Sequence, residues 1–388
     1  MRRRDFIRVF LIAIAGFGSA YLAYRLAISL PGSPRSSGQG STSTLRSSKL
    51  GDLIEVEVVA TDLEVPWSIA PVGYGEYFIS ERPGRILYLS RGGKRLVASF
   101  DVASVGEAGL LGLAVHPEYP SKPYLYAYLS YWSSGSIFNR IIRGRVEMDS
   151  GKPRLSSLVT ILDKIPGGYI HNGGRLRFGP DQKLYATTGD ASRPELAQDL
   201  GSLAGKILRL EDNGEIPRDN PFYPSPIYSY GHRNPQGIDW SPLQGFMIAS
   251  EHGPVGHDEI NLIKPGSNYG WPEEVGRGGR YNQPIIESGS TTWAPSGISF
   301  LRGNMFREFQ GDLLVACLRG EKILRISLHN EGEAELSEEL LVNSFGRLRD
   351  VVVDFDGSLL VSTSNRDGRG FVREGDDKIL RIIRKPHG

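Results

Sequence analysis

The sequence of 388 residues contains very little cysteine, very little net charge and no long segment of helical periodicity. Its one cysteine, Cys317, excludes an intrachain disulfide and lies in an apolar run, so we expect a buried, inert thiol. A formal net charge of +1 gives no reason to expect a nucleic-acid partner or an acidic membrane surface. The missing helical period disfavours alternating βα architectures. The 48 glycines and 24 prolines indicate instead a turn-rich, mostly β protein.

The first 52 residues differ in composition from the rest of the chain. Residues 1–30 open with a twin-arginine pattern, Arg2-Arg3-Arg4-Asp5-Phe6-Ile7-Arg8, and continue with an apolar stretch. They predict a signal peptide or an N-terminal membrane anchor. Residues 31–52 are rich in Ser and Gly and predict a flexible linker. We therefore expect an exported, extracytoplasmic protein that contacts a membrane only through this N-terminal segment.

One pattern recurs along residues 53–388. It consists of a strand with alternating apolar residues, a turn and a second strand, and it is often followed by a third strand that ends in Ile-Leu-Arg-Ile or a similar sequence. Six units of this kind predict an all-β fold, a six-bladed β-propeller with four-stranded antiparallel blades. A pair of β-sandwiches is the structural alternative. The predicted units start near Trp67, Gly112, Gly174, Gly237, Gly297 and Asp350.

Residues 53–59 alternate apolar and acidic side chains before the first unit begins. Pairing them with residues 379–383 would close the ring and remove two exposed sheet edges at once. We therefore expect the two ends of the folded region to share one blade.

Two glycine-rich segments carry a basic or titratable side chain just before a predicted strand. Ile170 to Arg175 holds His171, and Gly231 to Gly237 holds Arg233. In a ring of repeated sheets such turns converge on the axis, so the two segments predict one central site. Histidine, whose ordinary pKa is about 6.5, can accept a proton near neutral pH. Asp190, at the end of the next strand, can orient the imidazole; a turn histidine with Asp190 as a turn cap is the alternative.

Arg347 and Arg349 add two cations on one face of a later strand, because strand side chains alternate. Nothing acidic lies between them in the sequence, and two like charges on one face repel unless an anion binds there. The pair therefore predicts an anionic ligand, and with the two glycine-rich segments it predicts an enzyme with an anionic cofactor. Solvated surface arginines are the alternative.

Several motifs together resemble one known family over residues 55–385, the soluble quinoprotein glucose/sorbosone dehydrogenases, and most closely the pyrroloquinoline quinone (PQQ)-dependent aldose sugar dehydrogenases. The resemblance implies oxidation of aldose sugars at C1 to the lactone, with broad sugar specificity, by a monomer that passes electrons to an external acceptor. The motifs are Gly109-Leu110-Leu111-Gly112 with His116-Pro117, the His171 segment, Thr188-Gly189-Asp190, Gly231 to Gly237, Glu251-His252-Gly253-Pro254 and Arg347-Leu348-Arg349-Asp350.

The resemblance also implies roles for individual residues. His171 matches the general base, which also contacts the cofactor, and Asp190 matches the carboxylate that supports it. Arg233 and Asn234 match the pair that contacts the quinone oxygens, with Arg233 counted as catalytic. Three further positions match cofactor-carboxylate ligands: Arg347, Arg349 and Arg319, the last standing where relatives carry lysine.

Calcium is the second cofactor that the resemblance implies. Gly253 and Pro254 match backbone carbonyls that hold an ion bridging to the cofactor, and carbonyl oxygens suit this hard cation. Glu259 and Tyr269 match a second calcium site, made of a carboxylate and a backbone carbonyl, although Asp258-Glu259 could also be a solvated turn. A zinc site at His252, His257 and Asp258 is disfavoured, because their spacing matches no helical zinc motif.

The chain departs from the family at Glu107, where relatives carry a glutamine that lines the sugar pocket. Substrate preference therefore cannot be carried over. Two other functions remain as alternatives on the same fold. One is a non-catalytic propeller that binds a protein partner, like the Hedgehog-interacting proteins, and the other is a calcium-dependent sugar lactonase.

Overall fold

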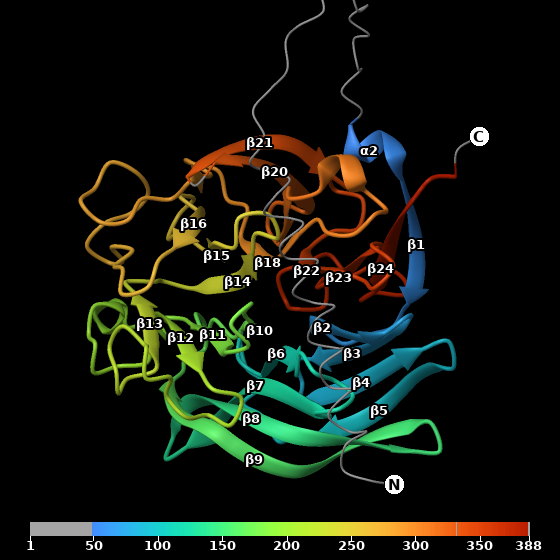
Figure 1. Ribbon diagram of the computed structural model, residues 1–388, viewed down its shortest axis with the longest axis horizontal. Helices are drawn as coiled ribbons and strands as arrows, with labels where there is room; N and C mark the ends of the chain where they lie inside the picture. The colour runs from blue at the N-terminus through green and yellow to red at the C-terminus, as the bar shows by residue number, and fades with distance from the viewer. Residues whose placement is uncertain (1–48, 331, 387–388) are drawn as a thin grey trace, which may run out of the picture. The chain divides into compact units, whose positions relative to one another are not determined.

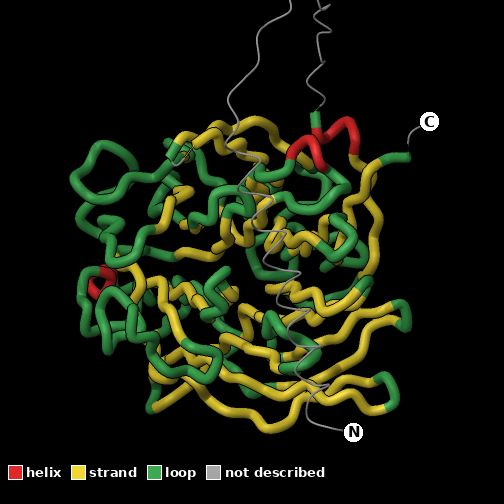
Figure 2. The backbone as a smooth tube through the Cα atoms, viewed as in Figure 1, coloured by secondary structure: helices red, strands yellow, loops and turns green. Residues whose placement is uncertain are grey.

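Six four-stranded antiparallel sheets surround a central axis in chain order, as Figures 1 and 2 show. This computed structural model describes residues 49–330 and 332–386. The predicted all-β, six-bladed propeller is confirmed. The signal or anchor predicted for residues 1–30 and most of the predicted linker 31–52 lie outside the described residues. Among those residues, no helix has the length and apolar character needed to cross a membrane.

The first three blades follow the predicted units closely. Blade 1 contains β2 (Pro66–Gly73), β3 (Glu76–Glu81), β4 (Arg85–Ser90) and β5 (Gly93–Ser99). Blade 2 contains β6 (Leu110–Val115), β7 (Tyr124–Ser133), β8 (Ser136–Asp149) and β9 (Lys152–Pro166). Blade 3 contains β10 (Leu176–Phe178), β11 (Leu184–Thr188), β12 (Lys206–Leu210) and β13 (Ile227–Tyr230).

The other three blades complete the ring. Blade 4 contains β14 (Pro235–Trp240), β15 (Met247–Glu251), β16 (Glu259–Ile263) and β17 (Ile286–Glu287). Blade 5 contains β18 (Pro295–Phe300), β19 (Leu313–Cys317), β20 (Lys322–Asn330) and β21 (Glu333–Leu340). Blade 6 contains β22 (Leu348–Val353), β23 (Leu359–Thr363), β24 (Ile379–Arg384) and β1 (Ile54–Ala60). The described helices are α2 (Leu50–Leu53) and the 3-10 turns η1 (Pro194–Ala197) and η2 (Arg307–Phe309).

The ring is closed by β1, which pairs with β24 from Ile54↔Arg384 to Ala60↔Ile379. The predicted pairing of residues 53–59 with 379–383 is therefore present. Helix α2 lies just before β1, inside the range predicted to be linker. Leu50 is buried, and the Glu338 carboxylate accepts the N–H groups of Leu50 and Gly51 at 3.0 and 2.8 Å. These contacts explain why the folded region starts slightly before residue 53.

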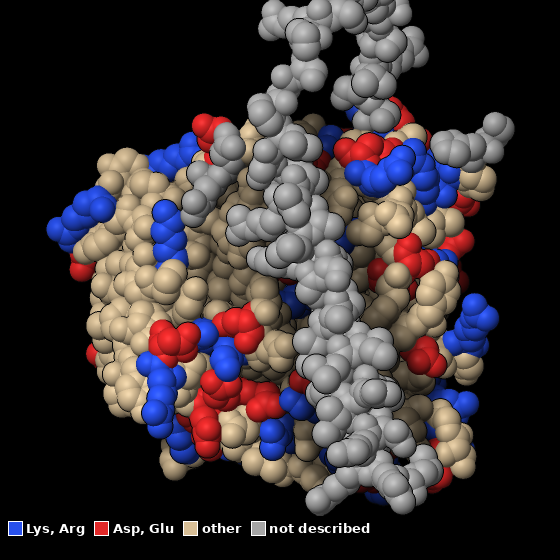
Figure 3. Space-filling model, viewed as in Figure 1, with Lys and Arg blue, Asp and Glu red and all other residues tan. Residues whose placement is uncertain are grey.

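Apolar side chains fill the spaces between neighbouring blades. Between blades 4 and 5, for example, Ile248 and Ile260 belong to one buried cluster with Phe300 and Val315. Cys317 lies in the same cluster with no exposed surface, and burial raises the pKa of its thiol. The prediction of a buried, inert cysteine is confirmed. On the face seen in Figure 3, basic and acidic side chains are interspersed, in keeping with the small net charge.

The antiparallel order decides which connections meet. In each blade the turn between the second and third strands, and the loop that leads to the next blade, lie on the same face of the ring. The first strands of neighbouring blades contact one another around the axis. Twelve connections can therefore converge on one end of the axis, which we call the pocket face. The predicted segments around His171 and Arg233 are both loops that lead to the next blade.

A buried ion pair crosses the axis. Arg175 Nη1 lies 3.0 Å from Asp350 Oδ2, and both side chains are almost completely buried. The same carboxylate oxygen accepts the Ile69 N–H at 2.9 Å, while Arg175 Nε donates to the Gln236 carbonyl at 2.9 Å. The guanidinium also stacks over Trp67, 4.3 Å from the ring centroid. Four blades are thus tied together at the centre.

We predict that Asp350→Ala lowers the free energy of unfolding by about 3–5 kcal/mol, because it leaves a buried guanidinium without its counter-ion. Denaturant titration of the purified protein measures this. Removing both charges with Arg175→Met and Asp350→Leu should recover much of the loss. Arg280→Ala, which breaks an exposed pair with Glu273, is the control and should cost at most about 1 kcal/mol. An equally small loss in Asp350→Ala would contradict the assigned role.

Candidate active site

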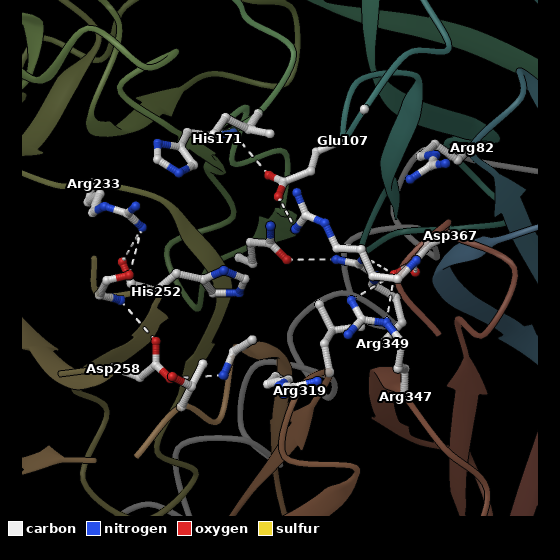
Figure 4. Close-up of a pocket in the computed structure, with 18 residues that line it drawn as sticks. Arg82, Glu107, His171, Arg233, His252, Asp258, Arg319, Arg347, Arg349 and Asp367 are labelled. Carbon is white, nitrogen blue, oxygen red and sulfur yellow. Dashed lines mark hydrogen bonds and ion pairs between the residues drawn. The ribbon is translucent and has the colours of Figure 1, made fainter. Parts of the chain in front are cut away.

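A cavity of about 470 Å³ opens at the axis on the pocket face (Figure 4). Six arginines line it, against three carboxylates, so its walls are strongly cationic. The lining residues come from strands β14 and β22 and from nine of the twelve connections on this face. They are Arg82, Glu107, Ile170, His171, Arg233, Gln236, His252, Asp258, Thr292, Ala294, Leu318, Arg319, Arg347, Arg349, Asp367 and Arg369, together with Gly106 and Gly253.

His171 and Asp190 form the hydrogen-bonded pair that the sequence predicted. His171 Nδ1 lies 2.8 Å from Asp190 Oδ1. The buried carboxylate is fixed by two more donors, the Ser192 N–H at 2.7 Å and Trp271 Nε1–H at 2.8 Å. Because an ionised carboxylate only accepts hydrogen bonds, it selects the tautomer with the proton on Nδ1. Nε2 is then an acceptor in an imidazole that lines the cavity.

The backbone of His171 is held as firmly as its ring. The residue has a left-handed conformation, with φ of 60°. Its N–H donates to Glu107 Oε2 at 3.0 Å, and its carbonyl accepts the Ala191 N–H at 3.0 Å. A Cβ atom at Gly189 would lie 2.0 Å from that carbonyl oxygen, so only glycine fits there. This close approach explains the glycine of the Thr188-Gly189-Asp190 motif.

Arg233 reaches the cavity from the loop between β13 and β14. Its Nη1 donates to the Gly253 carbonyl at 2.8 Å and to the His252 carbonyl at 3.3 Å. Burial lowers the pKa of this guanidinium, and Asp190 is the largest opposing influence. Its Nε is buried without a partner among the described residues. The group is positioned by its Nη1 bonds while one donor stays free.

Asn234 lies next to Arg233 but does not line the cavity. It is completely buried, and its Oδ1 accepts the Gly173 N–H at 3.0 Å. Its Nδ2 has no partner within the described part of the chain. The side chain therefore fixes the loop that carries His171 and leaves one amide donor unused.

Arg347 and Arg349 lie side by side in the cavity wall and are buried, not solvated. The carboxylate that the sequence did not place beside them is Asp367, on the connection between β23 and β24. It lies 2.8 Å from Arg347 Nη2 and 3.8 Å from Arg349 Nη2. Gln236 Oε1 also accepts from Arg349 at 2.7 Å. One carboxylate of the protein thus lies near both guanidinium groups, and the sequence between the two arginines gave no sign of it.

Arg349 nevertheless stays short of partners. Burial lowers its pKa to about 9; Asp367 opposes this effect, and Arg347 adds to it. Its Nε has no partner among the described residues. Arg319, at the cavity edge, has a guanidinium without any hydrogen bond or ion pair to the described residues. These two arginines can accept an anion without losing an existing ion pair at close range.

Glu107, the departure from the family pattern, joins two loops across the cavity mouth. Its Oε1 lies 2.7 Å from Arg369 Nη1, and its Oε2 holds the His171 amide. Burial alone would raise the pKa of this carboxyl, but His252, the His171 N–H and Arg369 together lower it below its ordinary value. Glu107 is thus a paired carboxylate, and its charge is balanced by Arg369.

Three charged lining residues were not named from the sequence. Arg82, Asp367 and Arg369 lie on connections between the second and third strands of blades 1 and 6. His171 and Arg233 lie in glycine-rich loops between blades, whereas these three residues lie in turns within blades. The strand pattern of the sequence could have indicated them, because in an antiparallel blade each turn between the second and third strands lies on the same face as the loops between blades.

A further lining residue, His252, was considered individually only as a zinc ligand. Burial lowers its pKa to about 3, opposed by Glu107 and reinforced by Arg349, so the ring is neutral. Its Nε2 is buried without a partner in the described region. His257 contacts Glu287 instead, and Asp258 accepts backbone N–H groups. No cluster of three His, Cys, Asp or Glu side chains that could hold a metal ion occurs among the described residues.

The residues suggested for calcium lie in two places. Gly253 lines the cavity with its carbonyl against Arg233, whereas Pro254 is exposed beside it and outside the wall. Glu259 is on β16. Burial, and then the charge of Glu251, raises the pKa of Glu259 to about 8. Its Oε2 accepts from Asn261 at 3.0 Å.

Oxygen atoms without donors lie at this second place. The Oδ1 of the buried Asn261 is an acceptor without a partner among the described residues. The side chain of Tyr269 is occupied, since its hydroxyl donates to the Leu262 carbonyl at 2.7 Å and its ring stacks on His232. Only the backbone carbonyl of Tyr269 could therefore serve as a ligand. The surplus of oxygen acceptors and the repelling carboxylates fit a hard cation.

We predict that Asp190 sets the tautomer of His171. Nitrogen NMR of the imidazole, at a pH where the ring is neutral, should show the proton on Nδ1 in the unmodified protein. Asp190→Asn should shift the population toward the other tautomer, because an amide can donate to Nδ1. The exposed His329, far from the pair, serves as the internal control. A tautomer ratio that does not change in the variant would show that Asp190 does not orient the ring.

Comparison with known proteins places the chain in a family. The sequence model described as Glucose / Sorbosone dehydrogenase matches residues 63–381. The aldose sugar dehydrogenase of Escherichia coli (strain K12) is 31% identical over 81% of this chain and 91% of its own.

Two solved structures agree with this assignment. One is described as an oxidoreductase (glucose dehydrogenase) from Thermus thermophilus, with 46% identity, a TM-score of 0.78 and coverage of 85% of this chain and 100% of its own. The PQQ-bound form of an aldose sugar dehydrogenase from Streptomyces coelicolor has 41% identity, a TM-score of 0.77 and coverage of 86% and 98%. The resemblance predicted from the motifs is confirmed, and the chain belongs to the glucose/sorbosone dehydrogenase family of oxidoreductases.

Proposed function

We propose that this protein oxidises aldose sugars at C1 to the lactone, with PQQ as hydride acceptor and calcium as the second cofactor. One observation carries the proposal: an imidazole oriented by a buried carboxylate shares a cavity with buried guanidinium donors that lack partners. Such donors need acceptors, because a buried polar group without a hydrogen bond is costly.

The donor set fits a planar tricarboxylate. Buried Nε groups of Arg82, Arg233 and Arg349 and the Nε2 of His252 have no partners among the described residues. Guanidinium groups pair with carboxylates in a bidentate manner and stack on flat rings. Six lining arginines against three carboxylates leave an excess of three positive charges, which a tricarboxylate would balance. Arg347, Arg349 and Arg319 would hold its carboxylates.

His171 would act as the general base. Its Nε2, free to accept, takes the proton from the C1 hydroxyl of the sugar, while Asp190 holds Nδ1–H and stabilises the resulting imidazolium. The quinone supplies the acceptor for the hydride that leaves C1. Arg233 would place N–H donors where negative charge develops during transfer. Asn234, which is buried next to Arg233, would fix the loop that carries His171.

Calcium would bind at two places. The carbonyls of Gly253 and Pro254 would hold an ion that also contacts the cofactor. Both are neutral ligands, so most of the affinity there must come from the cofactor's own oxygens. Glu259 and the Tyr269 carbonyl would hold a second ion at a place where burial, and then the charge of Glu251, raises the pKa of Glu259.

The sugar would enter beside Glu107, whose carboxylate can accept hydrogen bonds from hydroxyl groups. We propose a monomeric enzyme with broad aldose specificity that is exported through its N-terminal segment, or tethered by it, and reduces an external acceptor. The two alternative functions are less well supported. A lactonase needs side-chain carboxylates and amides around a metal, whereas this cavity is cationic. A non-catalytic propeller has no use for an oriented base beside unpartnered arginines.

The first test concerns the base. His171→Gln should lower kcat by at least about a hundredfold, the usual scale of general-base catalysis, while the affinity for quinone stays nearly intact. Steady-state kinetics with glucose and a quinone titration of the apoprotein measure the two effects. Wild-type turnover in this variant would refute the assignment of the base.

The second test concerns the arginine pair. Arg347→Ala combined with Arg349→Ala should weaken quinone binding by about 1.5–3 kcal/mol for each charged hydrogen bond lost. The KM for the sugar should change less. Fluorescence or calorimetric titration of the apoprotein measures the affinity, and Arg280→Ala on the surface is the matched control. An unchanged affinity would mean that these arginines do not hold the cofactor.

The third test separates the two calcium sites. Chelation and dialysis should leave a folded, inactive apoprotein, because blade packing and ring closure need no ion. In calorimetry, one calcium should then bind without quinone and a second only with it, since the two ligands bind cooperatively. Glu259→Gln should abolish only the quinone-independent event. Equal calcium binding with and without quinone would refute the ion at Gly253 and Pro254.

A further inference from the structure

A second hollow lies on the pocket face directly beside His171. It has a volume of about 310 Å³ and is lined by Trp132, residues 135–138, residues 166–169 and Arg193. We call it the rim groove. It belongs to the turn between β7 and β8, the loop that leads from blade 2 to blade 3, and the turn after β11. All three connections emerge on the pocket face.

The rim groove and the central cavity share one wall. Residues 166–169 line the groove, and the next two residues, Ile170 and His171, line the cavity. The turn that carries Arg193 is bonded to the same wall, since the Ala191 N–H donates to the His171 carbonyl at 3.0 Å. A molecule with one end at His171 could therefore continue into the groove.

Two large aromatic side chains are exposed in the groove. Trp132 is 49% exposed and Tyr169 is 62% exposed, and their ring centroids lie 6.3 Å apart at an interplanar angle of 73°. The four other tryptophans are buried or half-buried, so Trp132 is the most exposed tryptophan among the described residues. Exposed apolar surface of this kind, rimmed by polar groups, is typical of ligand-binding grooves.

The backbone under these rings is fixed. The Tyr169 carbonyl accepts the Glu107 N–H at 2.7 Å. The amide of Asn172 donates to the Gly168 carbonyl at 2.8 Å and its Oδ1 accepts the Gly168 N–H at 3.1 Å. Trp132 is paired with Ile137 in the ladder of β7 and β8. The rings thus stand on a rigid frame, so little conformational entropy is lost when a ligand covers them.

A guanidinium group that can donate hydrogen bonds also lines the rim groove. Arg193 is exposed, and within the described residues its guanidinium has neither a hydrogen bond nor an ion pair. It offers five N–H donors. An aromatic surface with an adjacent free donor suits a pyranose, which has flat C–H faces that pack on the negative face of a ring and hydroxyl groups that accept hydrogen bonds.

We propose that the rim groove binds the second and third sugar units of an oligosaccharide whose reducing end is oxidised at His171. The substrate class would then include short glycans that extend outward between blades 2 and 3. This proposal rests on the proposed function for the position of the reducing end. Binding in the groove itself needs neither quinone nor calcium.

The test uses ligands that cannot react. Maltotriitol and cellotriitol are reduced trisaccharides without an anomeric carbon at that end, so the protein can be studied without turnover by saturation-transfer NMR and calorimetry. At least one should bind the wild-type protein. Trp132→Ala combined with Tyr169→Ala should weaken this binding by about tenfold or more. The Trp132→Phe, Tyr169→Phe variant keeps aromatic faces and should retain most of it.

A matched control is Phe355→Ala, because Phe355 is 67% exposed on the opposite face of the ring, between β22 and β23, and should not affect the binding. The absence of binding to either trisaccharide, or equal binding in the alanine variant, would overturn the proposal.

Kinetics separate this inference from the proposed function. In the holoenzyme the alanine variant should lower kcat/KM for maltotriose or cellotriose by about tenfold and leave that for glucose within about twofold. If no aldose is oxidised but the trisaccharides bind in the groove, the proposed function is wrong and the inference that the groove binds sugar units is supported. If aldoses are oxidised but no trisaccharide binds, the inference about the groove is wrong and the proposed function is supported.

Discussion

The burial of guanidinium groups at the axis of a closed ring is the constraint on which this site depends. Charged and polar side chains line the cavity at the axis of the ring, whereas apolar side chains fill the spaces between neighbouring blades. At the centre of the ring Arg175 is neutralised by Asp350. Toward the pocket face, the buried Arg349 and the half-buried Arg233 each have an Nε donor without a partner among the described residues, and burial lowers the pKa of both. An acceptor-rich anion would relieve this cost, so the cavity is suited to an anionic ligand.

The same geometry orients the imidazole of His171, the proposed base. The pocket face gathers the loops between blades and the turns inside them, so that His171 from one loop meets Asp190 from the turn after β11. Trp271, from the long segment between β16 and β17, adds a third anchor to the carboxylate. The base, its orienting group and the cationic wall thus come from different blades. Their relative positions are maintained by blade packing and by the pairing of β1 with β24.

The fold was predictable because each blade repeats the same short signal, and so was the bond between His171 and Asp190, which belong to neighbouring connections. Contacts between distant blades were not predictable. Glu107 and Arg369 are 262 residues apart, and no local pattern links them. Asp367 was missed for a different reason: the sequence between Arg347 and Arg349 contains no acid, and the acid comes instead from the connection between β23 and β24 of the same blade. The roles of Arg319, Pro254 and Tyr269 stay predictions, since they depend on ligands.

The measurement that tests the central claim most directly is a titration of the chelated wild-type protein with PQQ in the presence of calcium, followed by anaerobic addition of an aldose. The account predicts one quinone per chain and a prompt change in the quinone absorbance when the sugar is added, with the lactone formed in equal amount. Binding without any absorbance change on addition of glucose or other aldoses would contradict the sugar oxidation. No quinone binding at all would contradict the interpretation of the cationic cavity itself.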